Sequence, residues 1–279
     1  MPKKLAYGCG SRQNLKHESQ QDQQSMGEKS KVVSIDGIKV ACANCSLATL
    51  CLPYGLESQD VERLENIVKR NKPIQRGQLL YGPGDQFRSL YVVKTGAVKT
   101  FTQTPAGDEH VIGFHLPGEI LGLDAIQDNQ HGCFAKALET TAVCELPFEK
   151  LEHLATAIPG LQHQMLRLLS REVSAEANMI SLLNNSTAEE RLASFLLSLS
   201  ERFRRRGFSP TDFFLAMSRQ DIGSYLGLAL ETVSRLFTRF QEQGVLEVDR
   251  KHVKIKDLDH LKQLLRHHTP CHASLNRSS

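Results

Sequence analysis

Closely spaced glycines constrain the fold of this chain more than any other feature of its sequence. Between Pro73 and Pro147 they stand at positions 77, 82, 84, 96, 107, 113, 118 and 122, and they separate short apolar runs such as Leu79–Tyr81 and Leu90–Val93. β-branched and aromatic residues between turn residues are typical of short antiparallel strands. We therefore expect a β-roll or barrel in this part of the chain.

A helical repeat replaces this pattern after Pro159. Residues at alternating spacings of three and four form the repeat: Leu166, Leu169, Val173, Glu176, Ile180 and Leu183. Such a stripe predicts the seam of a two-stranded coiled coil and thus a homodimer, although an amphipathic helix packed on its own domain would give the same pattern. Glu176 is the one carboxylate in the stripe. Across a two-fold axis it would face its own copy and weaken association.

Two helices joined by a tight turn are predicted near the C-terminus. Ser218 and Asp221 have the spacing of a capping box, and Gly227 permits the turn into the second helix. Ala229 stands where a capping Ser or Thr is expected, which costs about 1 kcal/mol of helix stability. The inward positions of the second helix recur at helical spacing: Val233, Leu236, Phe237 and Phe240.

The outer face of this second helix suits the major groove of double-stranded DNA. Arg235 can donate two hydrogen bonds to guanine, Glu231 can accept one from cytosine, and Ser234 is adaptable. Val245–Ile255, interrupted by polar residues, has the pattern of a β-hairpin wing beside the phosphates. The sequence therefore predicts a winged helix-turn-helix.

Three of the seven cysteines stand close together as Cys42-x2-Cys45-x5-Cys51. Thiolates at this spacing can wrap a soft metal centre, whereas structural zinc commonly uses two paired knuckles and only one such pair is present. A fourth ligand has to come from elsewhere. Spacing leaves four candidates for it, namely the favoured Cys144 and also Cys9, Cys133 and Cys271.

Length and composition bound the class of protein. With 279 residues and 40% apolar content, the chain can bury a core in each of two domains. Because we find neither a signal peptide nor about 18 consecutive apolar residues, we expect a cytoplasmic protein with no membrane partner. A net charge of +3 does not identify a nucleic-acid binder by itself. The polar, Gln-rich residues 1–35 are expected to be a disordered extension.

In this order the motifs resemble those of the oxygen-sensing FNR (fumarate and nitrate reduction) regulators of the cyclic-AMP receptor protein superfamily. The resemblance covers residues 40–262. Besides the cysteines, the matching segments are Lys72–Gln78, Gly113–Gly118, Ala188–Leu192, Arg206–Pro210 and Leu230–Arg235. The fold it implies is α+β, with a β-roll of the cyclic-nucleotide-binding type, a long dimerisation helix and a C-terminal winged helix-turn-helix domain. We place the cluster-binding segment and β-roll at 36–158, the dimerisation helix at 159–186, the DNA-binding domain at 187–262 and a flexible tail at 263–279.

The resemblance also implies roles for individual residues. It makes four cysteines the ligands of a 4Fe-4S cluster, namely Cys42, Cys45, Cys51 and Cys144, with Ser46 and Leu50 tuning access of oxygen. The residues that read a TTGAT...ATCAA palindrome would be Glu231, Ser234 and Arg235, with Ser218, Arg219 and Thr232 beside them. Dimerisation would be switched by Leu169, Val173, Glu176 and Ile180. Contacts with RNA polymerase would come from Gly107 and Asp108, in the loop 104–109, and from Arg206.

The predicted function is that of an oxygen-responsive activator and repressor of anaerobic genes, which dimerises while its cluster is intact. A cyclic-nucleotide regulator on the same fold is the main alternative, because Pro117–Gly122 resembles part of such a pocket. Residues 124–135, however, lack the Arg-Ser pair that would hold the cyclic phosphate. An iron-sulfur redox protein would not need a helix-turn-helix, and no catalytic constellation indicates an enzyme.

Overall fold

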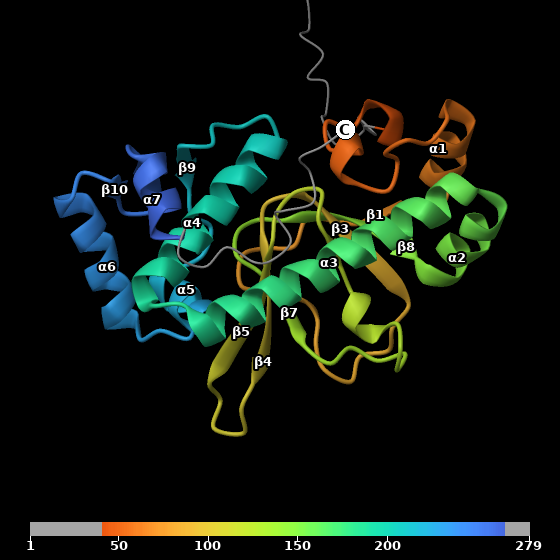
Figure 1. Ribbon diagram of the computed structural model, residues 1–279. Coiled ribbons are helices and arrows are strands. Elements are labelled where there is room, and N and C mark those ends of the chain that lie inside the picture. The colour runs from red at the N-terminus through yellow and green to blue at the C-terminus, as the bar shows by residue number, and fades with distance from the viewer. Residues whose placement is uncertain (1–40, 266–279) are drawn as a thin grey trace, which may run out of the picture. The chain divides into compact units, whose positions relative to one another are not determined.

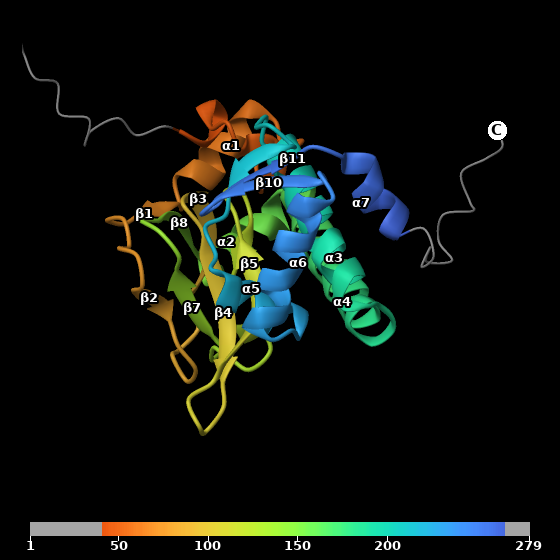
Figure 2. The ribbon, with the colours of Figure 1, turned by 90° about the vertical axis from the view of Figure 1, so that its left-hand side faces the viewer.

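Residues 41–265 are described by the computed structural model of the chain, which Figures 1 and 2 show from two sides. The predictions for residues 1–35, for Cys9 and for Cys271 therefore lie outside the described residues. No helix between residues 41 and 265 is both long and apolar enough to cross a membrane.

The N-terminal part is an antiparallel β-roll, as the glycine spacing predicts. Its strands are β1 (Lys69–Arg70), β2 (Leu79–Tyr81), β3 (Ser89–Thr95), β4 (Val98–Gln103), β5 (Glu109–His115), β6 (Ile120–Leu121), β7 (Phe134–Ala137) and β8 (Ala142–Pro147). One sheet has the order β1-β8-β3-β6 and the other β2-β7-β4-β5. Gly96 shows why glycine is needed at the turns: its φ is +82°, and a Cβ there would lie 2.5 Å from Thr141 Oγ1.

Short helices cover the first of these sheets. They are η2 (Cys42–Asn44), η3 (Ala48–Leu50), α1 (Ser58–Glu65) and α2 (Phe148–Ala157), while η4 (Leu123–Ala125) follows β6. In Figure 1 the cysteine-bearing segment, in orange, lies beside α1. A shared apolar core joins this segment, α1, α2 and the start of the next helix to the sheet, through Leu52, Leu64, Leu90, Leu146, Leu151 and Leu161.

The long helix predicted after Pro159 is present as α3 (Pro159–Asn185). Proline at its first position is favourable because that N–H has no partner within the helix. The following helix, α4 (Ala188–Arg205), begins with a capping box in which Thr187 and Glu190 bond each other's backbone N–H.

The C-terminal part is the predicted winged helix-turn-helix. It continues from α4 through β9 (Asp212–Phe214), α5 (Arg219–Leu226), α6 (Leu230–Glu242), β10 (Leu246–Asp249), β11 (His252–Ile255) and α7 (Leu258–Leu264). The wing is the three-stranded sheet β10-β11-β9. Figure 2 shows α5 and α6 side by side on the face turned to the viewer. The apolar core around α5 and α6 also includes Phe101 and Phe114 of the β-roll, so one continuous core joins the two parts.

Candidate functional site

All four predicted cysteine ligands line one small cavity, of about 40 Å³. Cys42 lies in η2, Cys45 and Cys51 follow the two short helical turns, and Cys144 is in the middle of β8. More than 90 residues separate Cys51 from Cys144 in sequence, and the β-roll brings them together. Of the two fourth-position candidates within residues 41–265, Cys144 lies at the cavity and Cys133 does not.

The walls of this cavity are mainly apolar. They include Leu47, Ala48, Leu52, Pro53, Leu64, Val68, Val92, Val93 and Leu146, together with the single cation Lys94. Burial raises the pKa of Cys51 to about 12, and burial and the neighbouring Glu65 raise that of Cys42 as well. Both thiols are thus held in the neutral form unless a cationic group enters the cavity. Among residues 41–265, no three His, Cys, Asp or Glu side chains come close enough to hold a single metal ion.

The first cysteine is tied to the β-roll through its backbone. The N–H of Cys42 donates to Glu65 Oε2 at 2.6 Å, and the same carboxylate forms an ion pair with Arg70. Arg70 stands directly opposite Cys144 in the pairing of β1 with β8. Burial alone would raise the pKa of Glu65, but the hydrogen bonds from Cys42 and Arg70 outweigh it and hold that pKa below its usual value. One carboxylate therefore connects the cysteine segment with the strand of the fourth cysteine.

The third cysteine is tied to α3. Gln164 Nε2 donates to the carbonyl oxygen of Cys51 at 3.1 Å, and Gln164 Oε1 accepts from Arg167 at 3.2 Å. The guanidinium of Arg167 lies 5.0 Å from the ring centre of Tyr54, in the same segment as the cysteines. The sequence did not single out the contacts of Gln164 with Cys51 and of Arg167 with Tyr54, because each joins residues more than a hundred positions apart.

Cys133 lies away from the cavity, in the interior of the β-roll. Its thiol is 3.6 Å from Asp124 Oδ2, and burial with that carboxylate raises its pKa to about 12. Beside it the ring of His131 stacks on Tyr81 with the ring centres 3.7 Å apart. Aromatic side chains and a carboxylate therefore fill this interior, where a cyclic phosphate would require a cation.

The helix-turn-helix forms with the local features that its sequence predicts. Ser218 and Asp221 make a capping box at the start of α5, and Gly227 ends the helix with φ +63°. Ala229, before α6, makes no side-chain cap. The predicted inward residues of α6 are buried, namely Val233, Leu236, Phe237 and Phe240.

The outer face of α6 is open to solvent at the predicted reading residues. Glu231, Ser234 and Arg235 are exposed, and Thr232 is half-buried. Arg219 behaves differently, because its guanidinium lies 3.2 Å from the ring centre of Phe237 and burial lowers its pKa to about 10. Three side chains on one helical face are thus free to meet base edges.

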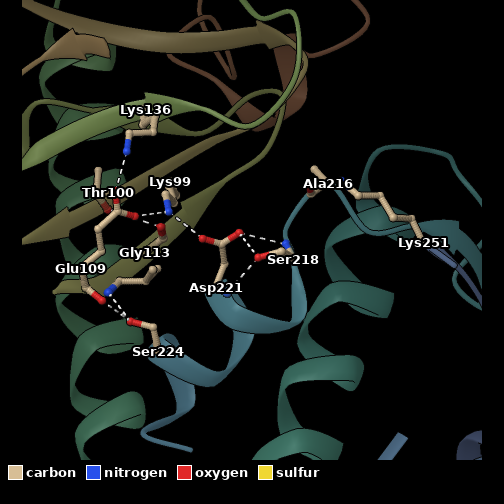
Figure 3. Close-up of polar contacts among 11 residues, drawn as sticks. Lys99, Thr100, Glu109, Gly113, Lys136, Ala216, Ser218, Asp221, Ser224 and Lys251 are labelled. Carbon is tan, nitrogen blue, oxygen red and sulfur yellow. Dashed lines mark hydrogen bonds and ion pairs between the residues drawn. The ribbon is translucent and has the colours of Figure 1, made fainter. Parts of the chain in front are cut away.

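A polar network holds α5 against the β-roll (Figure 3). Lys99 of β4 lies between Asp221, at 2.6 Å, and Glu109, which also pairs with Lys136. The hydroxyl of Ser224 accepts from Val111 N–H at 2.9 Å and donates to the carbonyl of Glu109 at 2.8 Å. Asp221 therefore has two roles: it belongs to the capping box of α5, and it forms an ion pair with Lys99 of the β-roll.

Comparison with known proteins identifies the family. Residues 71–157 match the cyclic nucleotide-binding domain family, and residues 190–264 match the Crp-like helix-turn-helix domain family. The fumarate and nitrate reduction regulatory protein of Escherichia coli (strain K12) is 48% identical over 231 residues, which are 83% of this chain and 92% of that protein. The corresponding protein of Klebsiella oxytoca is 49% identical, over 82% of this chain and 91% of the relative. The chain belongs to the FNR family of Crp/Fnr transcription regulators.

Solved structures agree with this assignment. FixK2 from Bradyrhizobium japonicum superimposes with a TM-score of 0.66 at 29% identity, over 71% of this chain and 97% of that one. This FNR-family protein is accordingly a DNA-binding transcription regulator and not an enzyme.

A second ionic contact joins the DNA-binding part of the regulator to the β-roll. Glu119 pairs with Arg202 and with Arg206 at 2.6 Å, and the pKa of Glu119 is about 2, because these two arginines outweigh its burial. The Arg206 side chain is only 3% exposed and also donates to the carbonyl of Pro117. It faces the protein interior here, whereas Asp108 and Gly107 lie exposed in the β4–β5 turn.

The long helix α3 of the regulator has two distinct faces. Leu161, Gln164 and Leu168 are buried against the β-roll. On another face lie the predicted seam residues Leu166, Val173 and Ile180, which are 59%, 66% and 62% exposed. Glu176 is exposed in the same stripe, and Leu169 is half-buried. The alternative explanation for the repeat was an amphipathic helix packed on its own domain. It does not account for this stripe, because these apolar side chains do not pack on the β-roll.

A larger cavity, of about 670 Å³, lies between the β-roll and the DNA-binding part. Apolar residues such as Leu116, Phe203, Phe213 and Met217 line it. It contains none of the four cysteines and none of the exposed reading residues of α6.

Proposed function

We propose that this protein is an oxygen-responsive activator and repressor of anaerobic metabolism, which binds DNA as a dimer while a 4Fe-4S cluster is intact. The observation that carries the proposal is the convergence of Cys42, Cys45, Cys51 and Cys144 on one apolar cavity. Cysteine thiolates are the usual ligands of such clusters. The curated relatives, named as fumarate and nitrate reduction regulators, support the same assignment.

The residues around the cavity fit a group of this charge. A cluster would supply iron ions that stabilise the thiolates, and an iron centre that oxygen can attack. Four thiolates also bring negative charge into an apolar site, which is costly unless cations are near. Arg70 and Lys94 are near Cys144, and they oppose the rise of its pKa that burial causes.

The DNA site that we propose is a TTGAT...ATCAA palindrome. On the exposed face of α6, Arg235 can contact guanine with two hydrogen bonds and Glu231 can accept one from cytosine, while Ser234 lies between them. Ser218, Arg219 and Thr232 lie near the ends of α5 and α6, where contacts with the phosphate backbone position a recognition helix. A palindrome requires two copies of this helix, related by a two-fold axis.

The homodimer is proposed to form through the exposed stripe of α3. Leu166, Val173 and Ile180 repeat every seven residues, and a second copy would remove their apolar surface from water. Glu176 would then meet the Glu176 of the second copy, and this repulsion opposes the dimer until cluster binding offsets it. The polymerase contact is proposed at the exposed Gly107 and Asp108. For Arg206 that role requires its pairing with Glu119 to open first.

The cluster assignment is tested on protein purified without air. We expect brown protein with roughly four iron and four sulfide per chain. Cys144→Ser should abolish the colour, whereas Cys133→Ser, which changes a thiol outside the cavity, should leave it unchanged. Colourless protein with stoichiometric zinc, or a Cys144→Ser variant that retains its iron, would refute the assignment.

A further inference from the structure

Gln164 is an unusual residue for its position on α3. It follows Leu161 and precedes Leu168 on the buried face, and its side chain is only 4% exposed. A buried amide is costly unless hydrogen bonds satisfy it, and an apolar side chain of similar size would fill the position without that requirement. The position therefore points to a role for its hydrogen bonds.

Those hydrogen bonds lead to the cysteine segment. The amide N–H of Gln164 donates to the carbonyl of Cys51, and the next residue, Leu52, is only 1% exposed. Helix α3 also approaches this segment closely at Gly160, where a Cβ would lie 3.1 Å from Leu56 Cδ2. The peptide that carries the third cysteine thus packs on the first turns of α3 and is bonded to it.

The other faces of the same helix carry the residues of the proposed dimer. Gln164 precedes Leu166 by two positions, and the exposed stripe continues through Val173 to Ile180. A continuous helix of 27 residues moves largely as one body, so a change in its first turns displaces the whole stripe. Only a contact that differs between two states can bias their equilibrium.

We propose that Gln164 is the positioning residue that couples occupancy of the cysteine pocket to the dimer surface of α3. This inference rests on the proposed function and names how it is regulated. Ligation of Cys51 fixes its peptide, and the bond from Gln164 then fixes the rotation and position of α3. Without ligation the peptide is free to shift, and the helix loses that constraint. Gln164 does not touch the bound group, and it acts through the backbone of Cys51.

Thermodynamic linkage makes this coupling measurable. If loading of the pocket strengthens the dimer by some factor, dimerisation must strengthen loading by the same factor. The quantity to determine is the ratio of the dimer dissociation constants of the stripped and the iron-loaded protein. Both constants come from anaerobic sedimentation, and iron content is measured by absorbance and chemical analysis.

The test variant is Gln164→Met, because methionine has a similar length and adapts to irregular core space. Loss of one hydrogen bond in each of two subunits is expected to lower the ratio about tenfold, while the iron content stays within twofold of wild type. His163→Met, at an exposed position of the same helical turn that lies off the stripe through Leu166 and Val173, is the control and should leave the ratio unchanged.

A second measurement does not depend on loading. In the stripped protein, Gln164→Met is expected to increase amide hydrogen exchange across residues 42–56, because the segment has lost its tie to α3. If the variant folds poorly, Gln164→Leu is compared in the same way.

The possible results separate the two proposals. A Gln164→Met protein that loads iron and keeps the wild-type ratio overturns the coupling role and leaves the proposed function standing. The proposed function, and this inference with it, is overturned if wild-type protein binds no iron. The same holds if its dimer dissociation constant is equal in the stripped and the iron-loaded protein.

Discussion

Replacing Lys99 by methionine should weaken the whole protein, although Lys99 touches neither the cysteines nor the reading helix. Its side chain is 8% exposed and lies between the carboxylates of Asp221 and Glu109. Burial would lower the pKa of Lys99, but the hydrogen bonds with Asp221 and Glu109 outweigh it and raise that pKa. Asp221, itself 14% exposed, would keep only its capping bonds with Ser218.

The expected loss of stability follows from the charged hydrogen bonds that Asp221 and Glu109 lose in Lys99→Met. A hydrogen bond to a charged group contributes about 1.5–3 kcal/mol, so we expect a loss near 2 kcal/mol of unfolding free energy. For a chain of this size that corresponds to a fall of about 4–8 °C in melting temperature. Lys136→Met is the matched control: it removes only the more exposed partner of Glu109, and should cost no more than about 1 kcal/mol.

The assay is urea unfolding of both variants between pH 7 and pH 3. The pKa values of Asp221 and Glu109 are lowered. The hydrogen bond with Lys99 outweighs burial at Asp221, and the hydrogen bonds with Lys136 and Lys99 outweigh it at Glu109. Their contribution is therefore present above the unfolded-state pKa, about 4, and is lost as the pH falls through the lower folded-state values. The difference between wild type and Lys99→Met should shrink accordingly. A variant as stable as wild type at pH 7, with Lys136→Met equally neutral, would refute the reasoning.

Four further outcomes are expected. In iron-loaded protein, Glu65→Gln should release iron several-fold faster to a chelator than the control Glu62→Gln, because the variant loses the ion pair with Arg70 that positions the acceptor of the Cys42 N–H; equal rates would show that this carboxylate does not hold Cys42. Arg235→Ala should lose about 1–3 kcal/mol of binding to the palindrome in gel-shift titrations and much less on random DNA. On the proposed function, Glu176→Ala should sediment as a dimer without the cluster, where wild type is expected to be monomeric, and a monomeric variant would place this side chain outside the interface. Because the pKa of Glu119 is lowered to about 2, urea midpoints should fall as the pH drops from about 4.5 toward 2, and Glu119→Gln should flatten that dependence.

Much of the local structure of this regulator could be predicted from short-range sequence patterns. The capping box at Ser218, the turn at Gly227 and the inward stripe of α6 depend on residues at most a few positions apart, and the structure confirms each of them. The glycine spacing likewise predicted the β-roll, because turns at short intervals force short strands. The strand order could not be read from the same signal, since it depends on which runs pair across long separations.

Long-range pairing also explains what the sequence left open at the sites. Spacing along the sequence left both Cys133 and Cys144 open as the fourth ligand. The folded β-roll places Cys144 beside the cysteine segment and Cys133 in the interior of the roll. Lys99 is an ordinary surface residue by its type, and its partner Asp221 is 122 residues away. Gln164 could have been noticed, because it interrupts the spacing of Leu161 and Leu168 on the buried face of α3.

Ser224 has a consequence for the isolated parts of the protein. Strand β5 is an outer strand of its sheet, and the hydroxyl of Ser224 occupies backbone groups of Glu109 and Val111 that a neighbouring strand would otherwise use. Ile112, the next residue of β5 after Val111, is 53% exposed. Uncovered strand edges bearing apolar side chains invite pairing with other chains. The DNA-binding part therefore covers this edge of the sheet. A truncated protein that ends before α4 would expose the edge of β5, and its self-association would then reflect pairing of exposed edges and not the dimer proposed through α3.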